Sequence, residues 1–187
     1  HSHGPKGRHS HEGVDGYIWP DPQSATVMAR EVGRALVRLM PERRDGLEGN
    51  LRTLVRDLDA LDKRLTSMAA GYDGRVILTS HPFYNYIARR YGWKIHSLLL
   101  EPDAMPSDSA FVSLKTVVDK TRARHLIWEA DPPQDVTARL EREFGLTSVV
   151  FRPLATLADA ERRAGVDYLS VMEQNIENIR PVFGSRE

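Results

Sequence analysis

One histidine stands at a point in the chain where binding chemistry is common. His81 follows the apolar run 76–78, which predicts a buried strand, and precedes Pro82, which suits the first turn of a helix. In open α/β sheets, ligands bind at the carboxyl edge of the strands, and a neutral imidazole there can ligate a metal or exchange a proton. The alternative is a histidine that only caps the helix or forms a structural hydrogen bond.

Four further charged side chains follow predicted strands in the same way. They are Glu101, Glu129, Asp131 and Arg152. Because the carboxyl ends of parallel strands meet at one edge of a sheet, we expect these side chains to lie near His81. For each acid taken alone, the alternative is an ordinary solvated or capping residue.

Other catalytic signatures are missing from the sequence. No glycine-rich phosphate-binding fingerprint follows any predicted strand, which disfavours nucleotide binding. There is no Gly-x-Ser-x-Gly string, and Ser80 adjoins His81 rather than facing it, so a Ser-His-Asp hydrolase is also disfavoured. An enzyme could use His81 and the strand-end acids as acid and base. Since no nucleophile lies beside a base, we predict that the chain is not an enzyme.

The first 13 residues hold a second group of candidate metal ligands. Four of the seven histidines occur there among Gly, Pro and Ser, namely His1, His3, His9 and His11. Such a polar tract should be disordered, and its two His-x-His pairs could capture zinc, copper or nickel weakly. An expression tag is the alternative, which the interruptions by Pro, Lys, Arg and Ser disfavour.

The composition narrows the possible partners. The 26 Lys and Arg residues balance 26 Asp and Glu residues, whereas nucleic-acid binding needs a basic excess. The chain has no Cys, which excludes disulfides, zinc-thiolate sites and a Cys nucleophile. No apolar run approaches the roughly 20 residues of a membrane span. We therefore expect neither a nucleic acid as the main partner nor a membrane span.

Behind these candidate residues, strand and helix patterns alternate. Apolar runs predict strands over residues 75–80, 94–100, 124–129 and 147–151. Each strand is followed by a helical pattern, and the last helix should follow a polar loop and run from about Val166 to Arg180. Strands joined by such crossovers predict the α/β class, with a four-stranded, mainly parallel sheet and helices on both faces.

Two helical patterns precede the sheet. Asp21 can cap a helix from about Pro22 to Met40, and Pro41 interrupts or kinks the pattern. The apolar stripe of this helix is Met28, Val32, Ala35, Leu36 and Leu39. A second long helix carries a narrow leucine seam, namely Leu47, Leu51, Leu54, Leu58, Leu61 and Leu65. The seam suits a coiled-coil dimer or packing within the chain, and its short length favours the second.

The 187 residues are enough for one sizeable domain. We predict three segments along the chain. Residues 1–13 form a disordered His-rich loop, and residues 14–71 form a linker string with a long helix, with or without a kink. Residues 72–187 form an α/β lobe.

Taken in order, several strings in this chain resemble those of a known family. They are Asp15-Gly16-Tyr17-Ile18-Trp19-Pro20-Asp21-Pro22, Ser80-His81-Pro82-Phe83-Tyr84-Asn85-Tyr86, Glu101-Pro102 with Pro106-Ser107, Trp128-Glu129-Ala130, Arg152-Pro153-Leu154, and Tyr168, Met172, Asn175 and Ile179 of the last helix. With the His-rich loop before them, they resemble the periplasmic metal-binding proteins of zinc and manganese ABC transporters, the cluster A-I solute-binding proteins. The resemblance covers nearly the whole chain, but only the linker helix and C-terminal lobe of that family.

The resemblance implies a metal-binding solute-binding protein of an ABC uptake system, with zinc expected more than manganese. It implies a divalent metal ion and an ABC transporter permease as partners, and a periplasmic or extracytoplasmic location. The chain begins without Met and without a signal peptide, so we expect a mature, processed or truncated product without the family's N-terminal lobe. The metal would contact His81 and the histidines of residues 1–13.

Two positions depart from the family's pattern. The resemblance places Tyr17 where the family has a ligand His, and Arg152 where it has a ligand Asp. A guanidinium is always protonated and cannot ligate a metal, so a family-type zinc site should be weak or absent. We expect Arg152 to pair with Glu129 or Asp131, and the alternative is a small anion or organic-ligand pocket formed with His81 and Tyr17. The alternative function is a relative that has lost metal binding and serves as an accessory or protein-interaction module.

Overall fold

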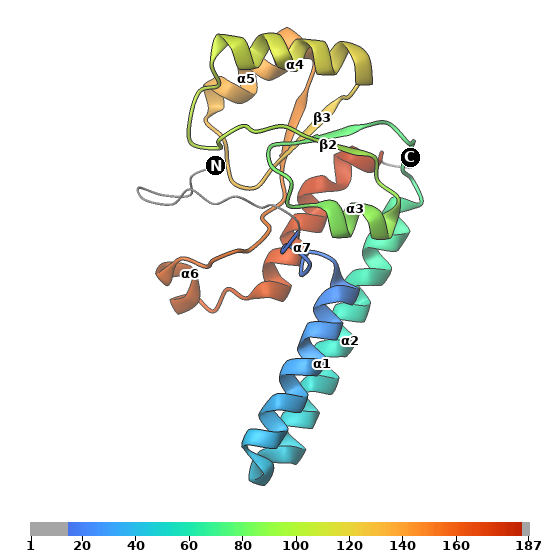
Figure 1. Ribbon diagram of the computed structural model, residues 1–187, viewed down its shortest axis with the longest axis vertical. Coiled ribbons are helices and arrows are strands. Elements are labelled where there is room, and N and C mark those ends of the chain that lie inside the picture. The colour runs from blue at the N-terminus through green and yellow to red at the C-terminus, as the bar shows by residue number, and fades with distance from the viewer. Residues whose placement is uncertain (1–14, 185–187) are drawn as a thin grey trace.

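A four-stranded sheet lies at the centre of the upper part of the molecule in Figure 1. The computed structural model describes residues 15–184. The strands are β1 (Ile77–Thr79), β2 (Ile95–Ser97), β3 (His125–Trp128) and β4 (Thr147–Val150). They lie in the order β2-β1-β3-β4, and each neighbouring pair is parallel. The predicted α/β class and parallel sheet are confirmed.

The strand order creates a switch point between β1 and β3. From β1 the chain passes to β2 on one side, and it then crosses to β3 on the other side of β1. Where two neighbouring connections leave a sheet in opposite directions, a crevice forms at the carboxyl ends of the strands. The residues that follow β1 and β3 are therefore the ones that this fold places at a ligand-binding position.

Helices cover both faces of the sheet, as predicted. Alternate strand residues point to opposite faces. On one face, Ile77, Ile127 and Val149 pack with α2 (Arg44–Ala69), α3 (Asn85–Tyr91) and α7 (Tyr168–Ile179). On the other face, Leu78, Leu126 and Trp128 pack with α4 (Asp108–Thr121) and α5 (Gln134–Phe144). The two apolar clusters enclose the sheet and hold its carboxyl edge in place.

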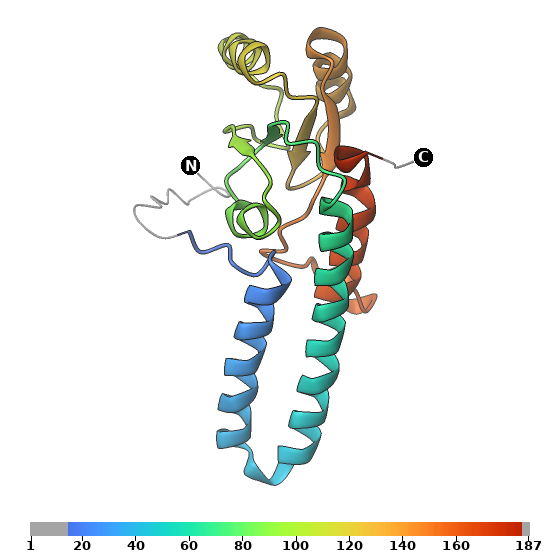
Figure 2. The same ribbon diagram turned by 90° about the vertical axis from the view of Figure 1, so that its right-hand side faces the viewer.

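The two helices that precede the sheet form an antiparallel hairpin, which projects from the rest of the molecule (Figure 2). They are α1 (Pro22–Leu39) and α2, joined by a 3₁₀ turn over Pro41–Arg43. The carboxylate of Asp21 caps α1 by accepting hydrogen bonds from two backbone N–H groups of its first turn, as predicted. The interruption at Pro41 is thus a reversal of chain direction. No helix within residues 15–184 is both long and apolar enough to span a bilayer.

The leucine seam of α2 is used within the chain. Leu58, Leu61 and Leu65 are buried in the core that α2 shares with α3 and α7. Further along the hairpin, Leu51 packs against Gly33 of α1, where an added Cβ would lie 2.8 Å from the leucine Cδ2. A larger residue at this glycine would require the side chain of Leu51 to shift.

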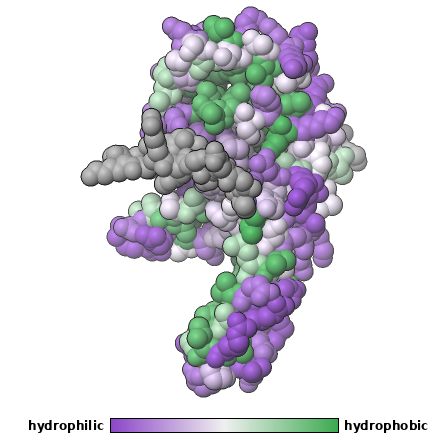
Figure 3. Space-filling model, in the orientation of Figure 1, coloured by the Kyte–Doolittle hydropathy of each residue, from purple (hydrophilic) through white to green (hydrophobic). Residues whose placement is uncertain are grey.

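Three residues of the predicted apolar stripe of α1 are exposed, whereas Ala35 and Leu36 of the same stripe are partly buried. Met28, Val32 and Leu39 have exposed fractions of 39%, 58% and 77%, and Figure 3 shows apolar surface on the hairpin. The side that meets α2 and the core carries small residues such as Ala29 and Gly33. Val37 lies on the same side, where it lines a cavity together with Leu47 and Leu51 of α2.

A polar cluster joins the hairpin to α3. Asp62 accepts two hydrogen bonds of 2.7 Å from the guanidinium of Arg90 and one of 2.7 Å from the Tyr91 hydroxyl. The side-chain amide of Gln23 adds a hydrogen bond of 3.1 Å. These donors, with Arg90 first, lower the pKa of Asp62. The cluster fixes the start of α1 relative to α3.

The helix after β1 begins later than predicted. The backbone N–H of Phe83 donates to the carbonyl of His81 at 3.0 Å, which makes a tight turn before the helix. Phe83 is buried, so the chain enters the core at this turn, and α3 begins at Asn85 rather than at Pro82. Gly92 ends the helix in a left-handed conformation (φ 71°) that glycine adopts readily.

A short helix, α6 (Asp159–Arg163), lies in the stretch predicted to be a polar loop. Its five residues are too few to show an apolar periodicity, so the sequence pattern did not indicate it. The carboxylate of Glu161 stabilises the helix start by accepting a hydrogen bond of 2.9 Å from the N–H of Ala158. The last predicted helix is α7, which begins at Tyr168 and is followed by a 3₁₀ turn over Arg180–Phe183.

Candidate functional site

His81 lies at the switch point between β1 and β3. The backbone N–H of Ser80 donates to the carbonyl of Ile127 at 2.8 Å, which continues the pairing of the two strands up to the histidine. The His81 side chain is fully buried, and its ring stacks on Phe83 with the ring centroids 5.6 Å apart. The fold therefore holds the imidazole at the edge of the sheet where sequence reasoning expects a ligand.

Glu129, at the end of β3, holds one side of this imidazole. Its Oε1 lies 2.8 Å from His81 Nδ1, and its Oε2 accepts a hydrogen bond from the hydroxyl of Ser80. When Nδ1–H is directed at a carboxylate, Nε2 is the nitrogen that binds a metal or a proton. The role of Ser80 was not predicted from the sequence. The available signal was its place directly after a strand that neighbours the strand of Glu129.

Glu101 faces the other nitrogen of the ring. Its Oε1 lies 3.6 Å from His81 Nε2, and its side chain is 48% exposed. The backbone N–H of Leu100 donates to the carbonyl of Ser80 at 3.2 Å, so the chain after β2 still runs beside the chain after β1. Of the strand-end acids predicted from the sequence, Glu101 and Glu129 are thus brought to His81.

The two acids change how His81 binds protons. Burial by itself lowers the pKa of His81, but the hydrogen bond and charge of Glu129 and the charge of Glu101 outweigh it, and the pKa is raised above the ordinary 6.5. The imidazolium is therefore stabilised between two carboxylates at acid pH. Because a metal binds only the deprotonated nitrogen, protons and cations compete for His81.

Tyr17 lies beside this group, on the segment that precedes α1. Its ring meets Phe83 edge-on, with the ring centroids 4.3 Å apart. Burial, followed by the charges of Asp15 and Glu129, raises the pKa of Tyr17, so its phenol is neutral at physiological pH. A neutral phenol donates or accepts hydrogen bonds, but it is a poor substitute for the imidazole that the resemblance expects here.

Two long-range hydrogen bonds hold the segment of Tyr17 in place. Trp19 Nε1 donates to the carbonyl of Pro153 at 2.6 Å, and the hydroxyl of Tyr168 donates to the carbonyl of Trp19 at 2.7 Å. The two residues of the first bond are 134 positions apart in the chain, and those of the second bond are 149 positions apart. They connect the segment to the loop after β4 and to the start of α7.

The prediction that Arg152 pairs with Glu129 or Asp131 is wrong. Its Nη1 lies 2.7 Å from Oε1 of Glu161, the residue that stabilises the start of α6. The buried side-chain amide of Asn175 accepts from the N–H of Arg152 at 2.9 Å and donates to its carbonyl at 2.8 Å. The guanidinium is directed to α6, and it was misassigned because α6 was not predicted.

The remaining candidates do not join the site. Asp131 is exposed, and within residues 15–184 no hydrogen bond or ion pair connects it to His81. In the same part of the chain, no three His, Asp or Glu side chains are arranged to hold a metal ion. Glu101 and Glu129 flank opposite nitrogens of the imidazole, so the two carboxylates do not converge on one point. The other predicted ligands lie outside the described residues, namely His1, His3, His9 and His11.

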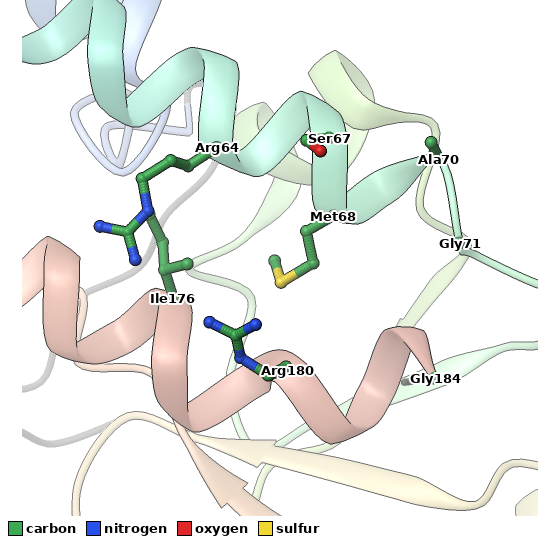
Figure 4. A pocket seen from close by; sticks show the side chains of 8 residues that line it. All are labelled: Arg64, Ser67, Met68, Ala70, Gly71, Ile176, Arg180 and Gly184. Atoms are coloured by element: carbon green, nitrogen blue, oxygen red, sulfur yellow. The ribbon is translucent and has the colours of Figure 1, made fainter. Parts of the chain in front are cut away.

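A cavity of about 550 Å³ lies elsewhere, between the last turns of α2 and the end of α7 (Figure 4). The guanidinium groups of Arg64 and Arg180 line it. Glu177 forms ion pairs with both, and Arg64 also contacts Glu173. Because carboxylates compensate both charges, this cavity offers no obvious attraction to a charged ligand.

Comparison with known proteins shows the family to which this chain belongs. The family model of ZnuA, the periplasmic zinc-uptake complex component A, matches residues 1–182. The zinc-binding lipoprotein AdcA of Streptococcus pneumoniae serotype 4 is 30% identical over 181 residues, covering 96% of this chain and 36% of that protein. The high-affinity zinc uptake system protein ZnuA of Bacillus subtilis is 26% identical over 168 residues, covering 89% and 53%. The chain thus spans about a third to a half of the length of these curated relatives.

Solved structures show the same fold. The Zn(II)-bound ZnuA-like domain of Streptococcus pneumoniae AdcA has a TM-score of 0.83 and 27% identity, covering 91% of this chain and 64% of that one. The metal-dependent lipoprotein YcdH of Bacillus subtilis has a TM-score of 0.81 and 25% identity, covering 89% and 63%. Since the family model matches nearly every residue, this chain belongs to the ZnuA family of periplasmic zinc-uptake components.

Proposed function

We propose that this chain is part of a zinc-binding protein that serves an ABC uptake system. The observation that carries the proposal is the geometry of His81. Its imidazole is buried at the switch point of the sheet, Glu129 holds its Nδ1, and its Nε2 faces the half-exposed Glu101. The protein would bind the ion as cargo outside the cytoplasm and release it to the transporter's permease. It would perform no reaction on the ion, so we propose a binding protein rather than an enzyme.

The chemistry of the donors favours zinc over manganese. An imidazole nitrogen together with a carboxylate oxygen is a common donor set for zinc, whereas manganese prefers oxygen donors throughout. Names of relatives point the same way, since AdcA is called a zinc-binding lipoprotein and its ZnuA-like domain was solved with Zn(II) bound. Zinc needs about four donors, so His81 and one carboxylate must be supplemented from beyond the described residues. The histidines of residues 1–13 are one source, and the rest of a longer protein is another.

The alternative function is an accessory or interaction module that has lost metal binding. Two observations favour it: the resemblance places ligands at the positions of Tyr17 and Arg152, and neither side chain ligates a metal readily. Tyr17 is a neutral phenol, and the guanidinium of Arg152 is tied to Glu161. This alternative predicts a chain that binds no zinc at concentrations where relatives do.

Zinc titration of four proteins tests the proposal. They are the wild type, His81→Ala, His96→Ala and a chain without residues 1–13, all purified without an affinity tag because the N-terminal tract is itself rich in histidine. Binding is followed by calorimetry and by competition with a chromogenic chelator. His96 is exposed in β2 and serves as the matched control.

We expect the wild type to bind zinc, and His81→Ala to lose at least one site that His96→Ala keeps. A wild type that binds no zinc would favour the accessory module. Binding that disappears without residues 1–13 and is indifferent to His81 would assign the metal to the N-terminal tract alone.

A further inference from the structure

We propose that Glu101 is the second metal donor of this chain, opposite His81, and that Glu129 is a positioning residue that never touches the ion. This assignment rests on the proposed function, because it requires a cation at His81. Under it, the acidic donor comes from the strand end of β2. The family resemblance instead implies a carboxylate at the end of β4, where this chain has Arg152.

Two distances separate the roles of the two acids. Donors bound to one tetrahedral zinc ion at roughly 2.0–2.2 Å lie about 3.3 Å from each other. The 3.6 Å between His81 Nε2 and Glu101 Oε1 is close to that separation and too long for a good hydrogen bond. The 2.8 Å between His81 Nδ1 and Glu129 Oε1 is a hydrogen-bond distance that leaves no room for an ion between the atoms.

The partners of each carboxylate lead to the same assignment. Both oxygens of Glu129 are engaged, one by His81 and the other by the hydroxyl of Ser80, and its side chain is only 12% exposed. Glu101 is 48% exposed, and within residues 15–184 its carboxylate has no ion pair other than that with His81. It can therefore rotate onto a cation without breaking another interaction, whereas Glu129 would have to release His81 to do so.

The backbone holds Glu101 at this position. Beyond β2 the chain continues beside β1, because the N–H of Leu98 donates to the carbonyl of Thr79 at 2.8 Å and the N–H of Leu100 donates to the carbonyl of Ser80 at 3.2 Å. The side chain of Leu100 is buried, which anchors the residue directly before Glu101. Glu101 therefore directly follows a hydrogen-bonded extension of β2 rather than lying in a free loop, as a preorganised ligand requires.

The surroundings of Arg152 are consistent with a carboxylate donor at the end of β2 instead of one at the end of β4. A guanidinium near the ion would repel it, but Glu161 holds the Arg152 side chain at 2.7 Å. The site therefore keeps one carboxylate donor for the cation, although the strand end of β4 supplies none. Imidazole and carboxylate together remain a donor pair suited to zinc.

The test compares Glu101→Gln with a matched control from the same stretch of chain. Asp103→Asn removes the same charge two residues away, on an exposed side chain. Zinc affinity is measured by chelator competition, and the visible spectrum of the Co²⁺-loaded protein reports the donor set. Circular dichroism and thermal melting confirm that each variant is folded. We expect Glu101→Gln to weaken zinc binding by at least about 100-fold and to change the Co²⁺ spectrum, and Asp103→Asn to do neither.

Rescue and positioning variants complete the experiment. Glu101→His should restore most of the affinity, since it returns a donor to the same place. Glu129→Gln should weaken binding but leave the Co²⁺ spectrum of the fully loaded protein nearly unchanged.

The outcomes separate this proposal from the proposed function. If His81→Ala abolishes binding while Glu101→Gln binds like Asp103→Asn with the wild-type spectrum, Glu101 is not a donor and the proposed function stands. If the wild type binds no zinc, both ideas are overturned. If the wild type binds zinc and His81→Ala changes nothing, the role of Glu101 is overturned and the metal is bound elsewhere in the chain.

Discussion

The carboxylate of Glu129 lies 2.8 Å from Nδ1 of His81 through one oxygen, and its other oxygen accepts a hydrogen bond from the hydroxyl of Ser80. A histidine held in this way by a carboxylate has a fixed ring orientation and a more basic outer nitrogen. The relationship joins the ends of β1 and β3, so the strand pairing itself sets the direction of the imidazole.

Removing the charge of Glu129 should therefore affect His81 in two ways. Glu129→Gln takes away the main interaction that raises the pKa of His81, so that pKa should fall. Zinc affinity should decrease about 10- to 100-fold, as for other outer partners of a ligand histidine. NMR titration of the imidazole C–H signals gives the pKa, and chelator competition gives the affinity. Glu141→Gln, an exposed acid on α5, is the control. An unchanged His81 pKa would contradict the argument.

The raised pKa of His81 also predicts how the stability of the metal-free protein depends on pH. Because the folded state binds this proton more tightly than the unfolded state, the stabilisation is complete below the ordinary value of 6.5 and is lost as pH rises through the folded value. The difference in the free energy of unfolding between wild type and His81→Gln should thus be larger near pH 5.5 than near pH 8.5. Urea unfolding in the presence of a chelator measures it. An equal difference at both pH values would show that the histidine is not more basic in the fold.

The cluster around Asp62 should contribute strongly to the attachment of the hairpin. Asp62→Asn removes the charge that accepts from Arg90 and Tyr91, and we expect a loss of about 2–3 kcal/mol in the free energy of unfolding. Since its partners lower the pKa of Asp62, this stabilisation is present above the ordinary value of 3.8 and is lost as pH falls through the folded value.

Chemical denaturation of Asp62→Asn beside Asp57→Asn measures the contribution of this cluster. Asp57 pairs with Arg56 on the exposed side of the same helix, and its variant should stay within about 0.5 kcal/mol of the wild type. Equal losses in the two variants would mean that the cluster adds nothing beyond a surface ion pair.

Restoring the two positions that depart from the family's pattern should strengthen metal binding. The double variant Tyr17→His and Arg152→Asp replaces a neutral phenol and a cation with two donors, so zinc affinity should rise at least about 10-fold. Calorimetry on the double variant and on each single variant measures the gain. Tyr17→Phe is the control for loss of the hydroxyl alone. If the double variant binds zinc no better than the wild type, these two positions do not line the metal site.

The neighbours of His81 at the sheet edge could be predicted from the sequence, because the carboxyl ends of parallel strands always lie at one edge. Parallel strands share one carboxyl edge, so residues 81 and 129 had to lie at the same edge once both strands were recognised. The side of the ring that each acid would face depends on strand order and on the backbone bond of Leu100 to Ser80. The hydrophobic periodicity of a single sequence shows neither the strand order nor this backbone bond.

The errors have equally local causes. Arg152 was assigned to the wrong partner because its partner Glu161 lies on α6. This helix has only five residues, too few for the apolar periodicity that identifies a helix in a sequence. The exposure of Met28, Val32 and Leu39 on α1 was not predicted, because a hydrophobic stripe in the sequence does not show how much of it a neighbouring helix covers.

The backbone bond from Leu100 to Ser80 has a consequence for how length can vary in this protein. Residues 102–107 lie beyond that bond, so insertions or deletions there should leave the carboxylate of Glu101 where it is. One residue gained or lost between Ile95 and Leu100 would instead reverse the alternation of side chains and turn that carboxylate to the opposite side. Homologues that depend on this acid should therefore differ freely in loop length after Pro102 and keep a constant spacing before it.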